Sequence, residues 1–295
     1  MSRPCVIEAP SILGLKPTGV EKLPEALLAQ GLIERLGARH AGRVDPLPYD
    51  PDRDPESGIR NGLAIAMYSS MLADSISAVL ERGEFPVVLG GDCTILLGAL
   101  LALRRRGRYG LLFLDGHADF YQPEANVNGE AASSELAFAT GRGPDILTTL
   151  EGHRPLVREE DVVALGIRDA KEAASYGSQP LPPRLRAFDA GEIQRRGIEE
   201  VAGEAVALLT RPELAGFWVH LDADVLDDAI MPAVDYRMPG GLSWDELAVV
   251  LDHAVHRGRA TGLHVTIFNP TMDGDGCIAS ALVSMLVRAM MLQAA

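Results

Sequence analysis

Short runs of apolar residues alternate along the chain with longer segments whose apolar positions recur every three or four residues. The apolar runs, typical of buried strands, lie at residues 5–9, 86–89, 111–114, 162–167, 217–221 and 262–268. The amphipathic segments, typical of helices, lie at residues 20–36, 61–82, 94–106, 197–209, 244–256 and 278–292. Strands that are apolar on both faces belong to a sheet covered on both sides. The pattern therefore predicts an α/β fold with a mainly parallel sheet between layers of helices.

Local signals place several boundaries. Ser243, followed by Glu246, predicts a capping box at the start of the helix that comes next. Gly37 predicts the end of the first helix. Residues 43–60 are rich in Pro, Asp and Arg and predict a loop, because the core pattern resumes directly after them. Segment 278–292 is too short and too often interrupted by polar residues to span a bilayer, so we expect a buried helix.

The composition is that of an acidic globular protein. The chain has 295 residues, 47% of them hydrophobic, and a formal net charge of −14. Because the alternation runs through the whole length, we expect a single domain over residues 1–295. Nucleic acids and anionic membranes both bind basic surfaces, so the charge argues against either as a partner. Three cysteines without disulfide or zinc-finger spacing, and no signal-like apolar start, favour a cytoplasmic protein.

Polar side chains gather where the predicted strands end. In open parallel sheets, ligands bind at the carboxyl ends of the strands, so groups far apart in the sequence should converge there. The groups that follow four of the strands are Asp92 and Cys93; Asp115, His117 and Asp119; Asp222 and Asp224; and Asn269.

The spacing of these acids fits a pair of bound cations. Asp222 and Asp224 lie two positions apart, which in an extended segment puts both carboxylates on one face with Cα atoms about 6.5 Å apart. Asp115 and Asp119 would be about 13 Å apart if extended, so the chain must turn near His117. Carboxylates with one imidazole favour an ion such as Mn²⁺. Each motif alone would more often be a solvated turn; their conjunction after apolar strands predicts a metal site.

Three motifs, in this order, resemble those of the ureohydrolase family, which includes arginase, agmatinase and formiminoglutamase. The family motifs are G-G-D-H, D-A-H-x-D and S-x-D-x-D-x-x-D-P with a later Pro-Gly-Gly. Here they read Gly90-Gly91-Asp92-Cys93, Asp115-Gly116-His117-Ala118-Asp119 and His220-Leu221-Asp222-Ala223-Asp224-Val225-Leu226-Asp227, with Pro239-Gly240-Gly241 further on. The resemblance covers roughly the whole chain. It implies a three-layer αβα sandwich around an eight-stranded parallel sheet and a centre of two Mn²⁺ ions.

The resemblance also implies a set of ligands. One metal would bind Cys93, Asp115, Asp119 and Asp222. The other would bind Asp115, His117, Asp222 and Asp224, so that Asp115 and Asp222 bridge the pair. Asp119 or Asp224 would orient a metal-activated water for attack on a guanidinium carbon. Asp92 would orient the loop behind the metals.

Further positions are carried over for the substrate and the assembly. Asn126, Asp169 and Lys171 are expected near the substrate, and Asn128 at a catalytic position. The expected partner is a small guanidino-type substrate, and related proteins commonly form homo-oligomers, trimers or hexamers.

Four positions depart from the family pattern. Cys93 replaces a histidine; a thiolate ligand would shift that site toward Zn²⁺ or Fe²⁺ or weaken one metal, and the alternative is a small buried apolar residue. Ile267 replaces the glutamate that pairs with the guanidinium. Asn128 replaces the proton-shuttling histidine, and Lys171 replaces an acid, where it would receive a carboxylate or stay solvated. The loop acids that could replace the missing glutamate are Glu130, Glu135, Asp273 and Asp275.

Three functions stay open on the sequence. The leading interpretation is hydrolysis of a guanidino or hydroxyguanidino C–N bond, which releases urea or hydroxyurea and an amine. The cysteine of the first motif is also similar to that of the bacterial amidinohydrolase of D-cycloserine biosynthesis, which acts on Nω-hydroxyarginine. The alternatives are hydrolysis of a formimino or amide C–N bond, and a degenerate metal-binding protein without catalysis.

Overall fold

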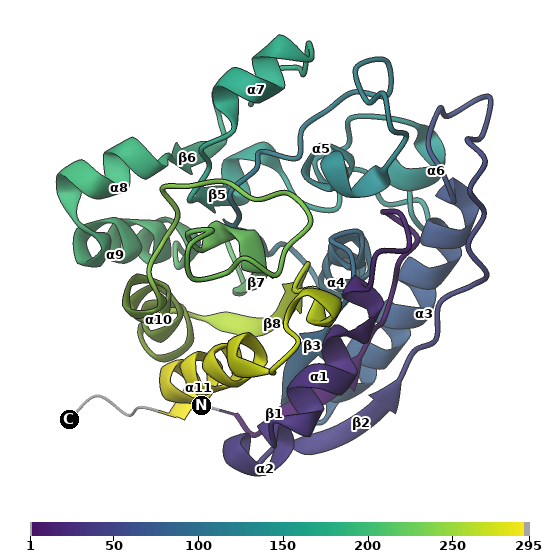
Figure 1. Cartoon of the computed structure of the whole chain (residues 1–295). Coiled ribbons are helices and arrows are strands. Elements are labelled where there is room, and N and C mark those ends of the chain that lie inside the picture. Colours follow the sequence, from purple (N-terminus) through teal and green to yellow (C-terminus); the bar gives the residue numbers. More distant parts are fainter. Residues whose placement is uncertain (1, 292–295) are drawn as a thin grey trace.

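Eight strands form one sheet in the computed structural model, which describes residues 2–291 (Figure 1). Their order across the sheet is β2-β1-β3-β8-β7-β4-β5-β6, and every neighbouring pair is parallel. The strands are β1 (Pro4–Glu8), β2 (Arg39–Arg43), β3 (Phe85–Leu89), β4 (Gly110–Leu114), β5 (Val162–Leu165), β6 (Arg186–Phe188), β7 (Phe217–Asp222) and β8 (Ala260–Thr266). The predicted eight-stranded α/β fold is confirmed.

Helices cover both faces of the sheet, which makes three layers (Figure 1). One face carries α3 (Gly62–Glu81), α4 (Ile95–Arg104), α5 (Glu135–Ala139) and α6 (Asp145–Thr148). The other carries α1 (Leu23–Ala29), α2 (Leu32–Leu36), α8 (Ala190–Arg196), α9 (Ile198–Leu209), α10 (Trp244–Asp252) and α11 (Cys277–Met291). Successive strand residues point to opposite cores: Val87 and Leu89 belong to one, and Val88 to the other. This two-sided burial explains the continuous apolar runs.

The six predicted strands are all present, and two further strands had no apolar signal. β2 and β6 lie at the two edges of the sheet, where residues such as Arg39, Arg43 and Arg186 are only partly buried or exposed. An edge strand that is covered incompletely needs no apolar run. The predicted strand at 262–268 ends early, because Ile267 has a φ of 70° and turns the chain out of the sheet.

The predicted helices are also present, with altered ends. The first is divided by Gly31, which has a φ of 75°, into α1 and α2. The capping box of Ser243 and Glu246 is confirmed at the start of α10, and a π-helical turn, His253–Arg257, continues that helix. α11 occupies most of segment 278–292, whose last residue lies outside the described residues.

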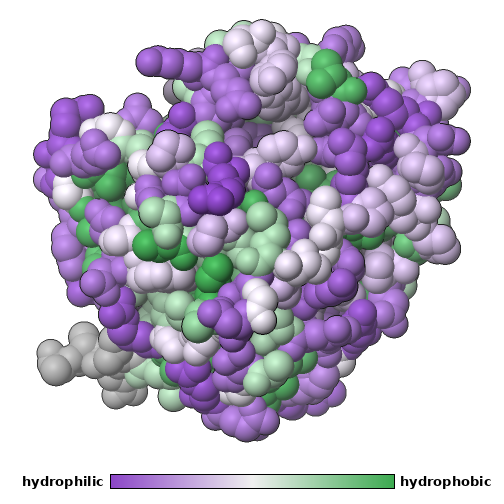
Figure 2. Space-filling view, viewed as in Figure 1, coloured by the Kyte–Doolittle hydropathy of each residue, from purple (hydrophilic) through white to green (hydrophobic). Residues whose placement is uncertain are grey.

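Among residues 2–291, α3 alone has the length and apolar composition of a membrane span. Its buried side chains include Ile65, Leu72, Ile76 and Val79, at helical spacing, and they pack in the core beside α4. This is the arrangement of a core helix. Figure 2, in the same view as Figure 1, shows a surface on which hydrophilic residues predominate, with small hydrophobic areas between them.

Candidate metal centre

The central strands bring the predicted polar groups to one edge of the sheet. β4 and β7 are neighbours; Asp115 follows directly after β4, and Asp222 is the last residue of β7. Cys93 lies in the loop between β3 and α4, and its Sγ is 2.9 Å from Oδ2 of Asp222. Groups separated by more than a hundred positions thus meet in one buried cluster.

Asp115 and Asp222 each begin a tight turn of the same kind. Oδ1 of Asp115 accepts a hydrogen bond from the backbone N–H of His117 over 2.6 Å, and Oδ1 of Asp222 accepts one from Asp224 over 2.7 Å. The predicted turn near His117 is confirmed, and Asp119 beyond it has a φ of 43°. The predicted extended segment from Asp222 to Asp224 is wrong, because the chain enters a 3-10 turn, Ala223–Val225. In both turns the carboxylate of the earlier residue therefore fixes the backbone two positions on.

Two glycines allow the first and second motifs to approach neighbouring backbone closely. A Cβ at Gly91 would lie 1.9 Å from the carbonyl oxygen of Ser11, and a Cβ at Gly116 would lie 3.0 Å from that of Asp224. Asp92, also buried, accepts hydrogen bonds from the hydroxyls of Ser11 and Thr94, each over 2.5 Å. Asp92 therefore fixes the first motif from behind.

The imidazole of His117 lies between carboxylates. Its Nδ1 is 2.9 Å from Oδ2 of Asp224 and 3.7 Å from Oδ1 of Asp115. Burial opposes protonation of the ring, but Asp224 and Asp115 favour it, so that the pKa of His117 is raised well above its usual value. One ligand atom from each of the three residues lies within 4.8 Å of the others, which suits a single cation.

The thiol of Cys93 is held in the same cluster. It is buried, and besides Asp222 it lies 3.2 Å from the hydroxyl of Thr266 at the end of β8. Burial raises the pKa of Cys93 well above its usual value, and the charge of Asp222 raises it further. Without a cation, Cys93 is therefore a protonated thiol that donates to a carboxylate.

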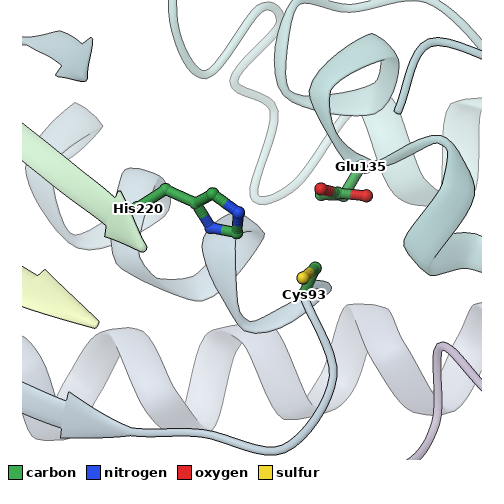
Figure 3. Close-up of side chains that lie close together, drawn as sticks. All are labelled: Cys93, Glu135 and His220. Carbon is green, nitrogen blue, oxygen red and sulfur yellow. The ribbon is translucent and has the colours of Figure 1, made fainter. Parts of the chain in front are cut away.

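Two more residues reach the cluster, and the sequence reasoning gave neither a place among the ligands. Glu135, at the start of α5, and His220, within β7, are both fully buried. Figure 3 shows their side chains converging with that of Cys93. One ligand atom of each of these three lies within 4.8 Å of the others, and Glu135 forms a second such group with Asp115 and Asp119. The signal available in the sequence was a charged residue, Glu135, at the head of the apolar run Leu136-Ala137-Phe138-Ala139.

The cluster has the properties of a site that binds cations. Burial raises the pKa of Asp119, and the neighbouring Glu135 and Asp115 raise it further. Buried atoms without a hydrogen-bond partner include Oδ2 of Asp115, both Oε atoms of Glu135 and Nε2 of His220. Polar atoms left unpaired in the interior are costly unless an ion or water completes them. The donor set of carboxylates with one imidazole and one thiol therefore fits divalent metals.

A cavity of about 260 Å³ opens beside the cluster. The cluster residues that line it are Cys93, His117, Asp119, Asp222 and Asp224. Asn126, Asn128 and Asp169 also line it, whereas Lys171 is exposed on α7 (Ala170–Ser175) and lies outside the lining, where its neighbour Glu172 takes part.

These lining residues differ in what they can offer a ligand. The amide of Asn126 is already used within its loop, since it donates to the carbonyl of Glu130 and accepts from the N–H of Gly129. Oδ1 of Asp169 is buried without a hydrogen-bond partner, and burial raises the pKa of Asp169. Asp169 is therefore a free acceptor at the cavity wall.

None of the four loop acids considered as replacements for the family glutamate lines the cavity. Asp273 and Asp275 accept hydrogen bonds from the first N–H groups of α11, and Glu130 contacts Lys16 and Tyr236. Glu135 belongs to the buried cluster and does not line the cavity. An acid that does line the cavity is Asp235, which the sequence reasoning missed; it is hydrogen-bonded to Asn269, two positions after Ile267.

Asp235 is held in a fixed orientation. It accepts hydrogen bonds from the amide of Asn269 over 2.9 Å and from the hydroxyl of Thr18 over 2.5 Å. Together with Ile267 and Asp169 it gives the cavity an acidic, partly apolar wall.

A parallel α/β sandwich with carboxylates and imidazole clustered at the ends of its central strands is the arrangement of a metal-dependent α/β enzyme. The family model for arginases matches residues 18–293. The chain belongs to the arginase family, whose members are binuclear metal enzymes. It is accordingly a metal-dependent hydrolase of the ureohydrolase type.

Individual relatives agree with this assignment. The arginase of Bacillus caldovelox is 29% identical over 292 residues, with 95% of each chain covered. The arginase of Brevibacillus brevis is 28% identical over 288 residues, again with 95% of each chain covered. The solved structure of the Bacillus caldovelox arginase superposes with a TM-score of 0.88 at 27% identity and covers 99% of both chains.

Proposed function

We propose that this protein hydrolyses a C–N bond of a guanidino or hydroxyguanidino compound and releases urea or hydroxyurea together with an amine. The observation that carries the proposal is the meeting of Asp115, His117, Asp119, Asp222 and Asp224 beside a cavity, in a chain of the arginase family. Bound there, two divalent ions would lower the pKa of water and supply a nucleophile at neutral pH.

The residues of the chain divide this work. Asp115 and Asp222, at adjacent strand ends, lie where they can hold both ions, and His117 with Asp224 completes one end. Cys93 and Asp119 belong to the other end, where the thiol favours Zn²⁺ or Fe²⁺ over Mn²⁺. Asp119 and Asp224 line the cavity, so their carboxylates can accept a proton from the attacking water.

The cavity wall suits a cationic substrate. Asp169, Glu172 and Asp235 all line the cavity and offer carboxylates to a guanidinium or an ammonium group. Ile267 stands where the family places a glutamate that holds the guanidinium. Asp235 also lines the cavity, and it takes over that role here. Asn128 has no group that gains or loses a proton near neutral pH, so it cannot shuttle a proton as a histidine would. A hydroxyguanidine, whose hydroxyl changes the proton demands of the reaction, therefore suits this site best.

The test is a product assay on the metal-loaded protein. Protein reconstituted with Mn²⁺, Zn²⁺ or Fe²⁺ is incubated with arginine, agmatine, Nω-hydroxyarginine and formiminoglutamate. Urea or hydroxyurea from a guanidino substrate supports the proposal. Formamide as the only product supports the formimino alternative, and no product in spite of bound metal supports the non-catalytic one. Asp224→Asn is the matched inactive control.

The expected assembly is a trimer or hexamer in the cytoplasm, which stays a prediction. Light scattering on the purified protein measures its mass. A monomer at micromolar concentration would contradict it.

A further inference from the structure

Glu135 is a buried carboxylate that the proposed chemistry leaves without a task. It begins α5, its side chain is fully buried, and neither Oε atom has a hydrogen-bond partner. Among residues 2–291, no Lys, Arg or His pairs with it. An ionised carboxylate in such a place is strongly unfavourable unless a positive charge accompanies it.

The position of Glu135 suits metal binding better than substrate binding. It does not line the cavity, although Cys93 and Asp119 beside it do. A carboxylate oxygen of Glu135 lies within 4.8 Å of Sγ of Cys93, and within the same distance of oxygens of Asp115 and Asp119. Metal–ligand bonds of about 2.0–2.3 Å can join two atoms that are at most about 4.6 Å apart. The atoms of the cluster therefore lie near enough to one another to share one ion.

His220 points into the same space but is prevented from acting as a ligand. Nε1 of Trp218 can only donate, and it donates to Nδ1 of His264 over 2.9 Å. His264 is fully buried, and burial lowers its pKa well below the usual value, so the neutral ring carries its proton on Nε2. That nitrogen faces Nδ1 of His220 at 2.5 Å. Nδ1 of His220 must accept, which leaves the proton of His220 on Nε2.

The proton on Nε2 gives His220 a different task. Nε2 lies 3.4 Å from Oδ2 of Asp115 without a hydrogen bond between the two atoms, so its proton faces the carboxylate that is expected to bridge the metals. A nitrogen that carries a proton has no lone pair for a metal. Of the three residues drawn in Figure 3, Glu135 and Cys93 are thus the possible ligands.

We propose that Glu135 is a direct ligand of the metal ion at the Cys93 end of the centre, together with Asp115 and Asp119, and supplies there a hard oxygen in compensation for the histidine that Cys93 replaces. The inference rests on the metal centre of the proposed function. It makes the centre asymmetric: one end has an imidazole and carboxylates, and the other has a thiol and an additional carboxylate.

The experiment measures metal binding without substrate. Wild type, Glu135→Gln and the control Glu130→Gln are stripped with a chelator and titrated with Mn²⁺ by calorimetry. Metal content after dialysis is then measured by mass spectrometry. Glu130 is the matched control because it is an equally buried acid five positions away, outside the cluster. We expect two ions in the wild type and in Glu130→Gln, and at least tenfold weaker binding of one ion in Glu135→Gln.

Other outcomes separate this inference from the proposed function. Two ions bound by Glu135→Gln with unchanged affinities would overturn it. His220→Asn should still bind two ions; loss of one ion there would show that the ring is a ligand after all. A wild type that binds two ions but turns over no substrate would refute the proposed function and leave the role of Glu135 standing. If Glu135→Gln is poorly folded, Co²⁺-loaded Glu135→Asp keeps the question open to an optical measurement, since an unchanged Co²⁺ spectrum would overturn the proposal.

Discussion

Sγ of Cys93 donates a hydrogen bond to Oδ2 of Asp222 over 2.9 Å, across the strand β8 that separates the ends of β3 and β7. The thiol therefore contacts the carboxylate expected to bridge the metals, and its replacement should change which metal is bound. A serine in its place keeps the size and the donor but removes the soft sulfur.

Cys93→Ser should lower the preference of the protein for Zn²⁺ over Mn²⁺ by about tenfold. Competitive loading with equal concentrations of the two metals, followed by elemental analysis, measures the ratio. Cys5→Ser provides the control, since Cys5 is a buried cysteine in β1 remote from the cluster. An unchanged ratio in Cys93→Ser would mean that the thiol is no ligand.

Metal should stabilise the protein more at high pH than at low pH. Burial raises the pKa of Glu135 and of Asp222, and nearby carboxylates raise both further. A folded, metal-free chain thus holds protons that the unfolded chain has lost above about pH 4. The contribution of these two carboxyl groups to the free energy of unfolding is fully present below the ordinary carboxyl pKa. It is lost as the pH rises through the raised pKa values of the folded protein.

A bound cation displaces those protons, so the metal-loaded protein does not lose this stability as the pH rises. The difference in Tm between metal-loaded and metal-free protein should therefore grow from about pH 5 to about pH 8. Scanning calorimetry at several pH values measures it, and Glu135→Gln should show a weaker increase. A difference that shrinks with pH would contradict the idea that the acids are protonated without metal.

Ile267→Glu should strengthen the binding of guanidinium groups. Ile267 lines the cavity, so a glutamate there would place a carboxylate in the position that the family uses. A charge-assisted hydrogen bond contributes about 1.5–3 kcal/mol, which corresponds to a gain of tenfold or more in affinity. Binding of arginine to the metal-loaded protein, measured by calorimetry, tests this, with Ile267→Gln as the uncharged control. Equal affinity in the two variants would show that the carboxylate does not reach the ligand.

Arg168→Lys should destabilise the fold around the third motif. Nη2 of Arg168 donates to the carbonyl oxygens of Asp224, Leu226 and Met238 over 2.6, 3.1 and 3.1 Å. Lysine lacks the planar fork and leaves part of this set unpaired, so we expect a loss of about 1–3 kcal/mol in the free energy of unfolding. Urea denaturation measures it. Arg237→Lys, at a more exposed arginine, should change stability by less than about 0.5 kcal/mol; equal losses in both would contradict the proposed anchoring.

The sequence predicted those parts of the fold and site that follow from local pattern. The central strands are buried on both faces and therefore carry apolar runs, and Asp115 and Asp222 follow two of them directly. β2 and β6 escaped prediction because edge positions leave their side chains partly solvated. The place of Glu135 depends on how α5 packs against α4, a tertiary contact that no spacing encodes. Asp235 depends in the same way on its contacts with Thr18 and Asn269.

The chain of hydrogen bonds from Trp218 through two imidazoles toward Asp115 gives the protein a built-in optical reporter. The protein has two tryptophans, Trp218 and Trp244, and Trp244 begins α10, outside the cluster. The fluorescence of Trp218 should change when a cation binds near Asp115, at the other end of this series of hydrogen bonds. The fluorescence of Trp244 should stay constant. Loading of the centre can then be followed in real time, without a dye or a substrate.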